Sequence, residues 1–208
     1  MKFVSLPKPY FEDEFSVIYN CKNELILPHL GRFDLLLTDP PFGIGFAAQP
    51  TTGGRRRNQS KETWDDEPGS VIPFLALTEL QIIWGGNYFP LPQSRGWLSW
   101  FKPDAPPSMG HFELAWTNMD MITRQISCSI AATNKERIGH PNQKPLNVMS
   151  GCLNFAPNAK TVLDPYLGSG TTAVACKQRG IHCVGIEQDE RYCAVAVERL
   201  RQNYLITA

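Results

Sequence analysis

The fold is decided by the stretch Thr161-Val-Leu-Asp-Pro-Tyr-Leu-Gly-Ser-Gly-Thr-Thr172. Its first residues form a short apolar run, which predicts a buried strand ending at Asp164, and its glycines predict a tight turn. A helix over 171–179 is expected next, and a second strand over 182–187 follows it. Apolar residues at helical spacing from Asp189 onward predict a closing helix. This order predicts a βαβ unit of a doubly wound α/β sheet.

A similar strand is expected in the N-terminal third. Residues 33–38 are mostly apolar and run directly into Asp39-Pro-Pro-Phe42, which we call the Asp-Pro-Pro-Phe corner. Proline cannot donate to the hydrogen-bond ladder of a sheet, so the strand should end here with Asp39 at its carboxyl end. Shorter apolar segments over 80–84, 96–101 and 112–117 predict further strands.

Length and composition exclude several classes of protein. The 208 residues, with 42% hydrophobic and 19% charged, suit a single globular domain over 1–208 and no disordered polyelectrolyte. We find no apolar run near the roughly 18 residues of a membrane span and no signal-peptide pattern, so a cytoplasmic location is expected. The six cysteines form no CxxC pair, which predicts free thiols and no metal site. Because Lys+Arg 20 balance Asp+Glu 20, a nucleic-acid partner would need local basic patches.

The glycine turn, residues 164–172, lets a ligand approach the backbone closely, although turn geometry alone also explains its glycines. A phosphate loop is excluded because the GKS/T signature is absent. A dinucleotide site stays open, since Gly168, Gly170 and Ala173 fit the looser pattern, but Asp164 is a poor neighbour for a pyrophosphate. Glu187, about 20 residues after the turn, is placed to accept hydrogen bonds from ribose hydroxyls unless it is simply a solvated strand end. The two acids together suit a nucleoside carrying a cationic amino acid.

The Asp-Pro-Pro-Phe corner offers a carboxylate, a carbonyl and an aromatic ring. A planar base could stack on Phe42 and donate the hydrogens of its exocyclic amino group to Asp39 and to the carbonyl of Pro40. These bonds would aim the nitrogen lone pair at an electrophile. A turn of this composition also occurs as plain structure, so the corner alone does not decide a function.

Three motifs together carry a resemblance to a known family. Thr38 to Phe42, His140-Pro-Asn-Gln-Lys-Pro145 and Asp164 to Thr172, in this order, resemble the amino-directed DNA methyltransferases of the permuted beta group. Residues 83–89 and 96–102 are similar to middle strands of that family, and the likeness spans 16–204. The resemblance implies a Rossmann-like doubly wound sheet of the S-adenosylmethionine-dependent methyltransferase type, mostly parallel with an antiparallel edge strand.

The resemblance also implies a cofactor, S-adenosylmethionine, and roles for single residues. Asp39, Pro40 and Phe42 would bind a base flipped out of double-stranded DNA, and methyl transfer to its amino nitrogen would be direct, with no cysteine nucleophile. Asp39 favours adenine N6, because cytosine-directed members often have Ser at this position. The cofactor-binding residues would be Asp164, Tyr166, Gly168, Ser169, Gly170, Thr171, Thr172 and Glu187, with His140, Gln143 and Lys144 closing the site. Lys144 would then be a partner for the methionine carboxylate.

Residues 43–70 hold few apolar residues and predict a mobile loop beside the active site. This loop contains Arg55, Arg56, Arg57 and Lys61, which we expect to contact DNA phosphates around a flipped base. The acids at 62 and 65–67 leave a solvated loop as the alternative. Residues 117–139 predict only a short insert and no large recognition domain. The resemblance implies pairing of two copies, so a homodimer is expected, and a compact phage or prophage methylase suits this size better than part of a large restriction-modification system.

Several functions stay open on the sequence alone. The target could be the N4 amino group of cytosine, or a base in RNA. A non-catalytic, methyltransferase-like subunit that binds nucleic acid is a second class, but such subunits usually lose residues equivalent to Asp39, Gly168 and Gly170, which are present here. A dehydrogenase with a related sheet would leave the Asp39 and His140 motifs unexplained.

Overall fold

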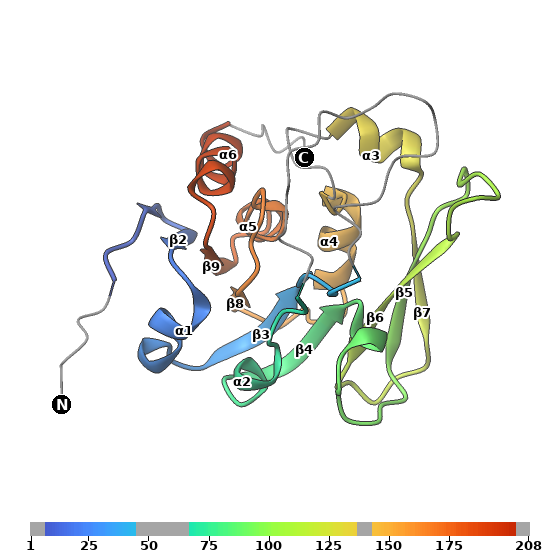
Figure 1. Ribbon diagram of the computed structural model, residues 1–208, viewed down its shortest axis with the longest axis horizontal. Helices are drawn as coiled ribbons and strands as arrows, with labels where there is room; N and C mark the ends of the chain where they lie inside the picture. The colour runs from blue at the N-terminus through green and yellow to red at the C-terminus, as the bar shows by residue number, and fades with distance from the viewer. Residues whose placement is uncertain (1–6, 45–66, 137–142, 203–208) are drawn as a thin grey trace.

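We analysed the chain as a computed structural model, which describes residues 7–44, 67–136 and 143–202 (Figure 1). The described helices and strands, with 3₁₀ helices marked η, are β1 (Phe11–Glu12), β2 (Ser16–Asn20), α1 (Asn23–Ile26), η1 (Leu27–His29), β3 (Phe33–Thr38), α2 (Ile72–Leu75), β4 (Thr78–Trp84), η3 (Gly86–Tyr88), β5 (Trp97–Phe101), β6 (Phe112–Thr117), β7 (Arg124–Ser127), α3 (Ile130–Glu136), α4 (Leu146–Leu153), β8 (Thr161–Asp164), α5 (Thr171–Lys177), β9 (His182–Glu187) and α6 (Glu190–Arg201).

These strands form a nine-stranded sheet in the order β1-β2-β9-β8-β3-β4-β6-β5-β7. The run from β2 to β4 is parallel throughout, and it includes the two strands that carry the motifs, β3 and β8. β6 runs antiparallel to both of its neighbours, β4 and β5. The doubly wound, mostly parallel sheet is therefore confirmed, but the main antiparallel strand lies inside the sheet. Only the two-residue β1 is an antiparallel strand at an edge.

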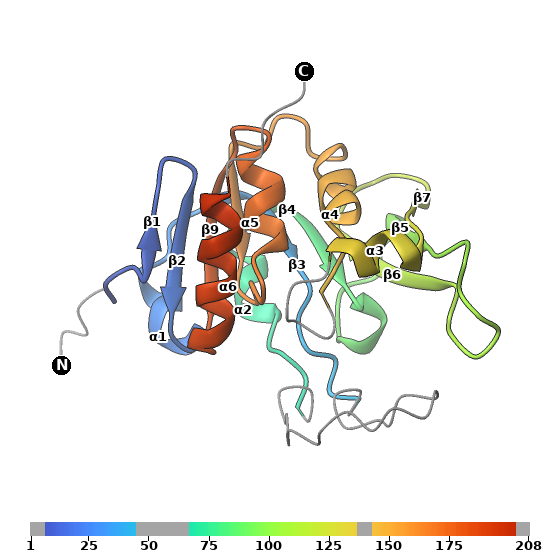
Figure 2. The same ribbon diagram turned by 90° about the horizontal axis from the view of Figure 1, so that it is seen from above.

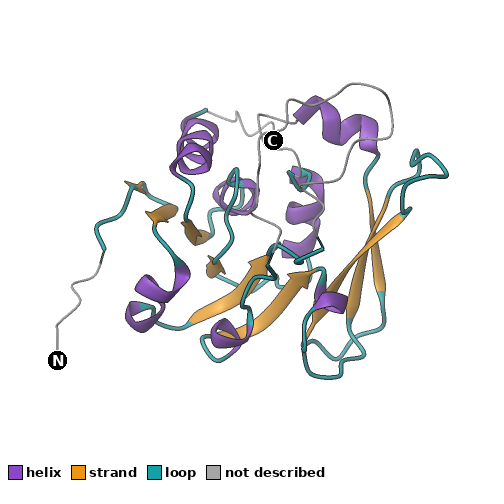
Figure 3. Ribbon diagram, viewed as in Figure 1, coloured by secondary structure: helices purple, strands orange, loops and turns teal. Residues whose placement is uncertain are grey.

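Helices cover both faces of the sheet (Figure 2; Figure 3). Side chains alternate across a strand, so Leu35 and Leu37 pack into the apolar layer beneath α4, α5 and α6 while Leu36 packs on the opposite side with α1 and α2. All three leucines are fully buried, and burial of each contributes roughly 1.5–3 kcal/mol. This double coverage explains why β3 reads as a continuous apolar run.

The structure describes part of both expected connecting segments. The expected insert over 117–139 contains β7, which pairs with the edge of β5, and α3 after it. Of the expected loop over 43–70, the structure describes the two ends. Phe42 pairs with Pro68 in an isolated bridge, and the Gly69 amide donates to the Pro41 carbonyl at 2.8 Å. The two ends of this segment are thereby held together at the Asp-Pro-Pro-Phe corner.

Candidate functional site

The two principal motifs meet at the carboxyl edge of the parallel sheet. β3 and β8 are neighbours, with Leu35 opposite Val162 and Leu36 opposite Leu163. At their ends the Thr38 hydroxyl donates to Oδ1 of Asp164 at 2.7 Å. A direct hydrogen bond therefore joins the residue before the Asp-Pro-Pro-Phe corner to the first acid of the glycine turn. Ligands of doubly wound sheets bind at this edge.

The glycine turn is braced from two sides. Its Gly168 amide donates to Oε2 of Glu187 at 2.9 Å, which ties the turn to the end of β9. Arg199 of α6 is buried and donates through Nη1 to the Ser169 carbonyl at 2.7 Å and to the Thr171 hydroxyl at 3.0 Å. The side chains of Ser169, Thr171 and Thr172 are themselves buried. The turn is consequently a fixed structure on which a ligand can be placed.

The surroundings of the Asp164 and Glu187 carboxylates disfavour their charged forms. Burial raises the pKa of Asp164 to about 6, although hydrogen bonds from Thr172, Thr38 and the Tyr166 amide lower it in part. Burial also raises the pKa of Glu187, against amide donors from Asp189 and Gly168. Within residues 7–44, 67–136 and 143–202, neither acid forms an ion pair with a lysine or arginine. These two carboxylates accept hydrogen bonds, and they therefore suit a ligand that carries a cationic group and hydroxyls.

The raised pKa of Asp164 predicts a stability cost at neutral pH. Because the folded chain holds this proton more tightly than the unfolded chain, the stability due to Asp164 is present below pH 4 and falls as pH rises through about 6. We expect Asp164→Asn to raise the free energy of unfolding at pH 7.5 by up to about 3 kcal/mol, and by less at pH 5. Urea unfolding at both pH values checks this.

Asp34 supplies the matched control for that experiment. Its Oδ2 accepts hydrogen bonds from the amides of Lys160 and Thr161, at 2.7 and 2.8 Å, and these bonds lower its pKa. Asp34→Asn should therefore destabilise the chain, in the opposite direction to Asp164→Asn. A destabilising effect of Asp164→Asn at both pH values would contradict the assigned burial cost.

Aromatic rings surround the Asp-Pro-Pro-Phe corner. Phe42 stacks on Tyr88, with ring centroids 5.1 Å apart, and Tyr88 is 49% exposed. Gly85 lies so close that a Cβ there would meet the Phe42 ring at 2.0 Å. On the other side, a Cβ at Gly69 would meet the Tyr166 ring at 2.8 Å and Pro40 at 3.0 Å. The corner and Tyr166 of the glycine turn thus share one local packing arrangement.

A chain of ion pairs leads away from Asp39, in which the two lysines are buried and the two carboxylates are partly buried. Nζ of Lys144 lies 3.0 Å from Oδ1 of Asp39 and 2.7 Å from Oε2 of Glu113. Lys102 donates to the other oxygen of Glu113 at 2.5 Å. Burial opposes the charge of Glu113, but Lys144 and Lys102 outweigh it and lower the pKa of Glu113 to about 2. Burial also opposes the charge of Lys144, whereas Asp39 and Glu113 raise its pKa overall.

The structure brings together most residues singled out from the sequence. Asp39, Pro40, Phe42 and Lys144 lie at the corner, and Asp164 and the glycines of 164–172 lie beside it with Glu187. Gln143, next to Lys144 in the chain, is buried. The roles given to these residues stay predictions. His140, Arg55, Arg56, Arg57 and Lys61 lie outside the described residues.

Sequence reasoning missed Glu113, Lys102, Arg199 and Tyr88 as members of the site. Glu113 sits on β6, where the sheet register sets it opposite Trp100, and no local motif marks it. Arg199 is one of several charged residues in α6, and no local motif marks it. Only Lys102 had a signal, because it closes the 96–102 segment that resembles the family.

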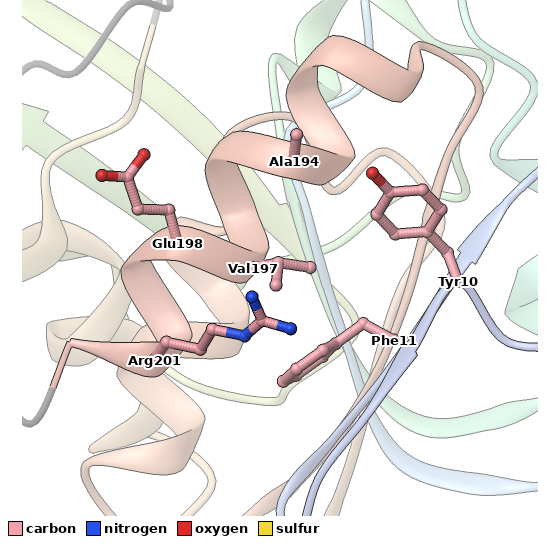
Figure 4. A pocket seen from close by; sticks show the side chains of 6 residues that line it. All are labelled: Tyr10, Phe11, Ala194, Val197, Glu198 and Arg201. Atoms are coloured by element: carbon pink, nitrogen blue, oxygen red, sulfur yellow. The ribbon is translucent and has the colours of Figure 1, made fainter.

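A separate hollow lies between β1 and α6, with a volume of about 370 Å³ (Figure 4). The Arg201 guanidinium lies 5.7 Å from the centre of the Phe11 ring in its wall. None of its lining residues is a predicted site residue.

In the part of the chain that the structure describes, no helix is long and apolar enough to cross a membrane. The same residues contain no His, Cys, Asp and Glu group arranged to hold a metal ion.

Comparison with known proteins identifies relatives. Residues 76–198 match the family model N6_N4_Mtase, described as DNA methylase. The chain is 36% identical over 77 residues to the type II methyltransferase M.ScaI of Streptomyces caespitosus, covering 36% of this chain and 25% of that protein. It is 34% identical over 94 residues to M.HinfI of Haemophilus influenzae, covering 41% of this chain and 26% of that protein. The chain thus spans about a quarter of the length of these two relatives.

Longer matches are weaker in identity. The type II methyltransferase M2.LlaDCHI of Lactococcus lactis subsp. cremoris is 21% identical and aligns with 96% of this chain and 94% of its own length. Among solved structures, the M1.HpyAVI-SAM complex has a TM-score of 0.60 at 20% identity, covering 89% of this chain and 99% of that one. The cytosine-N4-specific PvuII DNA methyltransferase has a TM-score of 0.59 at 15% identity, covering 96% of this chain and 91% of that one. These two structures share the fold described above.

Proposed function

This chain belongs to the N6_N4_Mtase family of DNA methylases, and we propose that it transfers a methyl group from S-adenosylmethionine to the exocyclic N6 amino group of adenine in DNA. The observation that carries the proposal is the 2.7 Å hydrogen bond between Thr38 and Asp164. It sets the Asp-Pro-Pro-Phe corner, which suits a planar amino-bearing base, directly beside acids that suit a cationic nucleoside.

The acids of the glycine turn fit the proposed cofactor. S-adenosylmethionine carries an ammonium group and two ribose hydroxyls. Asp164 is buried and Glu187 is partly buried, and neither has a lysine or arginine ion-pair partner in the described residues. Asp164 would hold the ammonium group, and Glu187 the hydroxyls, while Gly168 and Gly170 keep side chains out of the way. When bound, the cofactor supplies an electrophilic methyl group. A related fold, M1.HpyAVI, is described as a complex with SAM, which supports this choice.

The residues of the corner would bind and orient the target base. Asp39 and the Pro40 carbonyl would accept the two amino hydrogens, which draws the amino nitrogen out of conjugation with the ring. Phe42 would stack on the base, a contact worth about 1–3 kcal/mol. Tyr88, stacked on Phe42, holds the ring in place and widens the aromatic surface. Because a duplex hides the amino group within its stack, the base must be flipped out to reach this corner.

The basic residues of the 43–70 segment are our candidates for contacts with the DNA backbone. We propose that Arg55, Arg56, Arg57 and Lys61 contact phosphates near the flipped nucleotide. Support comes from the ends of their segment, since Phe42 and Pro68 pair at the corner itself. The expected pairing of two copies stays a prediction.

The choice of adenine rests on Asp39. The second candidate target is the N4 amino group of cytosine, which is favoured by the likeness in fold to a methyltransferase described as cytosine-N4-specific. The chain should be expressed in a bacterial host that lacks its own DNA methylases, and the host DNA digested and analysed by mass spectrometry. N6-methyladenine supports the proposal. N4-methylcytosine would move the target and keep the site, and absence of both would overturn the proposed function.

A further inference from the structure

Lys144 occupies an unusual position for a lysine. It precedes α4 and is 8% exposed, yet its Nζ contacts two carboxylates that come from different parts of the sheet. Asp39 follows β3, and Glu113 lies on the antiparallel strand β6. The ammonium group also lies 5.1 Å from the centre of the Trp84 ring and 5.9 Å from that of Phe42. These neighbours restrict where the buried ammonium group of Lys144 can lie.

The charges of Lys144 and the three charged groups linked to it balance. Lys102 and Lys144 contribute two positive charges, and Asp39 and Glu113 two negative ones. Taking charges out of water is costly, and such a set persists only when each member has an opposite charge in contact. If Glu113, held between two lysines, turned away from Lys144, two positive charges would share the single carboxylate of Asp39 or lose their partner. The geometry of Glu113 and Lys102 therefore fixes the direction from which Lys144 meets Asp39.

We propose that Lys144 is a positioning residue that holds the Asp39 carboxylate ionised and in one orientation, with Glu113 and Lys102 fixing Lys144. The inference rests on the proposed function and deepens it, because it states what makes Asp39 ready to accept the amino hydrogens of a base. It also assigns Lys144 to the base side of the site. The sequence had suggested the methionine carboxylate as its partner.

The other ionisable groups near this chain act in known directions. Asp164 of β8 interacts with Asp39 as a like charge, which helps to raise the pKa of Asp164. The Cys152 thiol of α4 also interacts with Lys144, but burial raises its pKa to about 12, so it is neutral. Lys144 is thus the described cation in contact with Asp39, and Glu113 is the anion that balances its remaining charge.

The test compares Lys144→Met with Lys144→Arg and with the control Lys177→Met. Lys177 forms an equivalent ion pair with Asp13 at 2.7 Å, away from the corner. We expect Lys144→Met to lower kcat about 10²-fold while the Kd for S-adenosylmethionine stays unchanged. The acid limb of the kcat profile should move to higher pH, because the carboxylate loses the cation that favours its ionised form. Lys144→Arg should recover part of the rate, and Lys177→Met should match the wild type in both measurements.

A double variant guards against loss of folding. Removing Lys144 alone leaves an excess buried negative charge, whereas Lys144→Met with Glu113→Gln leaves one lysine and one aspartate and restores the balance. This double variant should fold and still show the loss in kcat. A higher Kd for the cofactor with an unchanged acid limb would overturn the proposal in favour of the methionine carboxylate. An unaltered kcat in a folded variant would overturn it as well.

A second readout separates this inference from the proposed function. Carbon-13 NMR titration of the Asp39 carboxyl measures its pKa without any turnover, and Lys144→Met should raise that pKa. If the wild type methylates no DNA, the proposed function fails, and this titration alone decides whether Lys144 holds Asp39 ionised. An Asp39 pKa that is the same in wild type and Lys144→Met overturns the inference.

Discussion

Asp39→Asn is expected to lower kcat for methyl transfer to DNA by about 10³-fold. The substitution keeps the size of the side chain but replaces the carboxylate with an amide, whose NH₂ group would face either the base or Lys144. In the first case the base loses an acceptor for an amino hydrogen, and in the second the amide turns a donor toward the Lys144 ammonium. In both cases Glu113 is the remaining carboxylate contact of Lys144. Single-turnover kinetics with saturating cofactor and DNA would measure the loss.

Affinity for the cofactor should survive this change, because Asp164 and Glu187 are untouched. Asp120→Asn is the matched control, since Asp120 pairs with Arg95 on the surface with both side chains largely exposed. It should leave kcat and the cofactor Kd at wild-type values. A kcat for Asp39→Asn within a few fold of the wild type would show that the corner does not handle the reacting amino group.

Gly170→Ala is expected to have the largest effect on stability and on cofactor binding. Gly170 has φ +82°, and an added Cβ would lie 2.6 Å from Cβ of Ala196 and 3.0 Å from its Cα. The left-handed backbone costs about 1 kcal/mol for a residue with a Cβ, and the overlap with α6 adds about 1–3 kcal/mol. The free energy of unfolding should therefore fall by about 2–4 kcal/mol.

The same change should weaken cofactor binding at least tenfold, because the turn can relieve the overlap only by moving away from α6. Urea unfolding and calorimetric titration with S-adenosylmethionine measure the two effects. Gly31→Ala is the control, since nothing lies within 4 Å of its added Cβ. Adding Ala196→Gly to Gly170→Ala should recover part of the overlap cost, because the contact with Cα of residue 196 at 3.0 Å remains, and it should keep the backbone cost. Equal stability of Gly170→Ala and wild type would contradict the geometry of the turn.

The parts of the site that depend on neighbouring residues in the chain were predictable from the sequence. An apolar run ending in Asp164 and another ending in Asp39 both predicted parallel strands, and the carboxyl ends of such strands meet at one edge. The hydrogen bond from Thr38 to Asp164 joins the carboxyl ends of these two strands, as that rule predicts. The positions of Gly168 and Glu187, and their contact across the turn, follow from the same βαβ unit.

The charge chain was not predictable in this way. Glu113 reaches Lys144 because β6 is inserted antiparallel between β4 and β5, a pairing that no local pattern specifies. Arg199 likewise reaches Ser169 only because α6 packs against the glycine turn, at the point where Gly170 permits close approach. Such contacts depend on sheet order and helix packing.

The most direct test of the central claim is transfer of tritiated methyl from S-adenosylmethionine to unmethylated duplex DNA. The wild type and Asp39→Asn should be assayed side by side, and the nucleosides separated by chromatography after digestion. The account predicts label in N6-methyladenine with the wild type and almost none with the variant. Equal label with both proteins, or no label with a wild type that binds the cofactor, would contradict it.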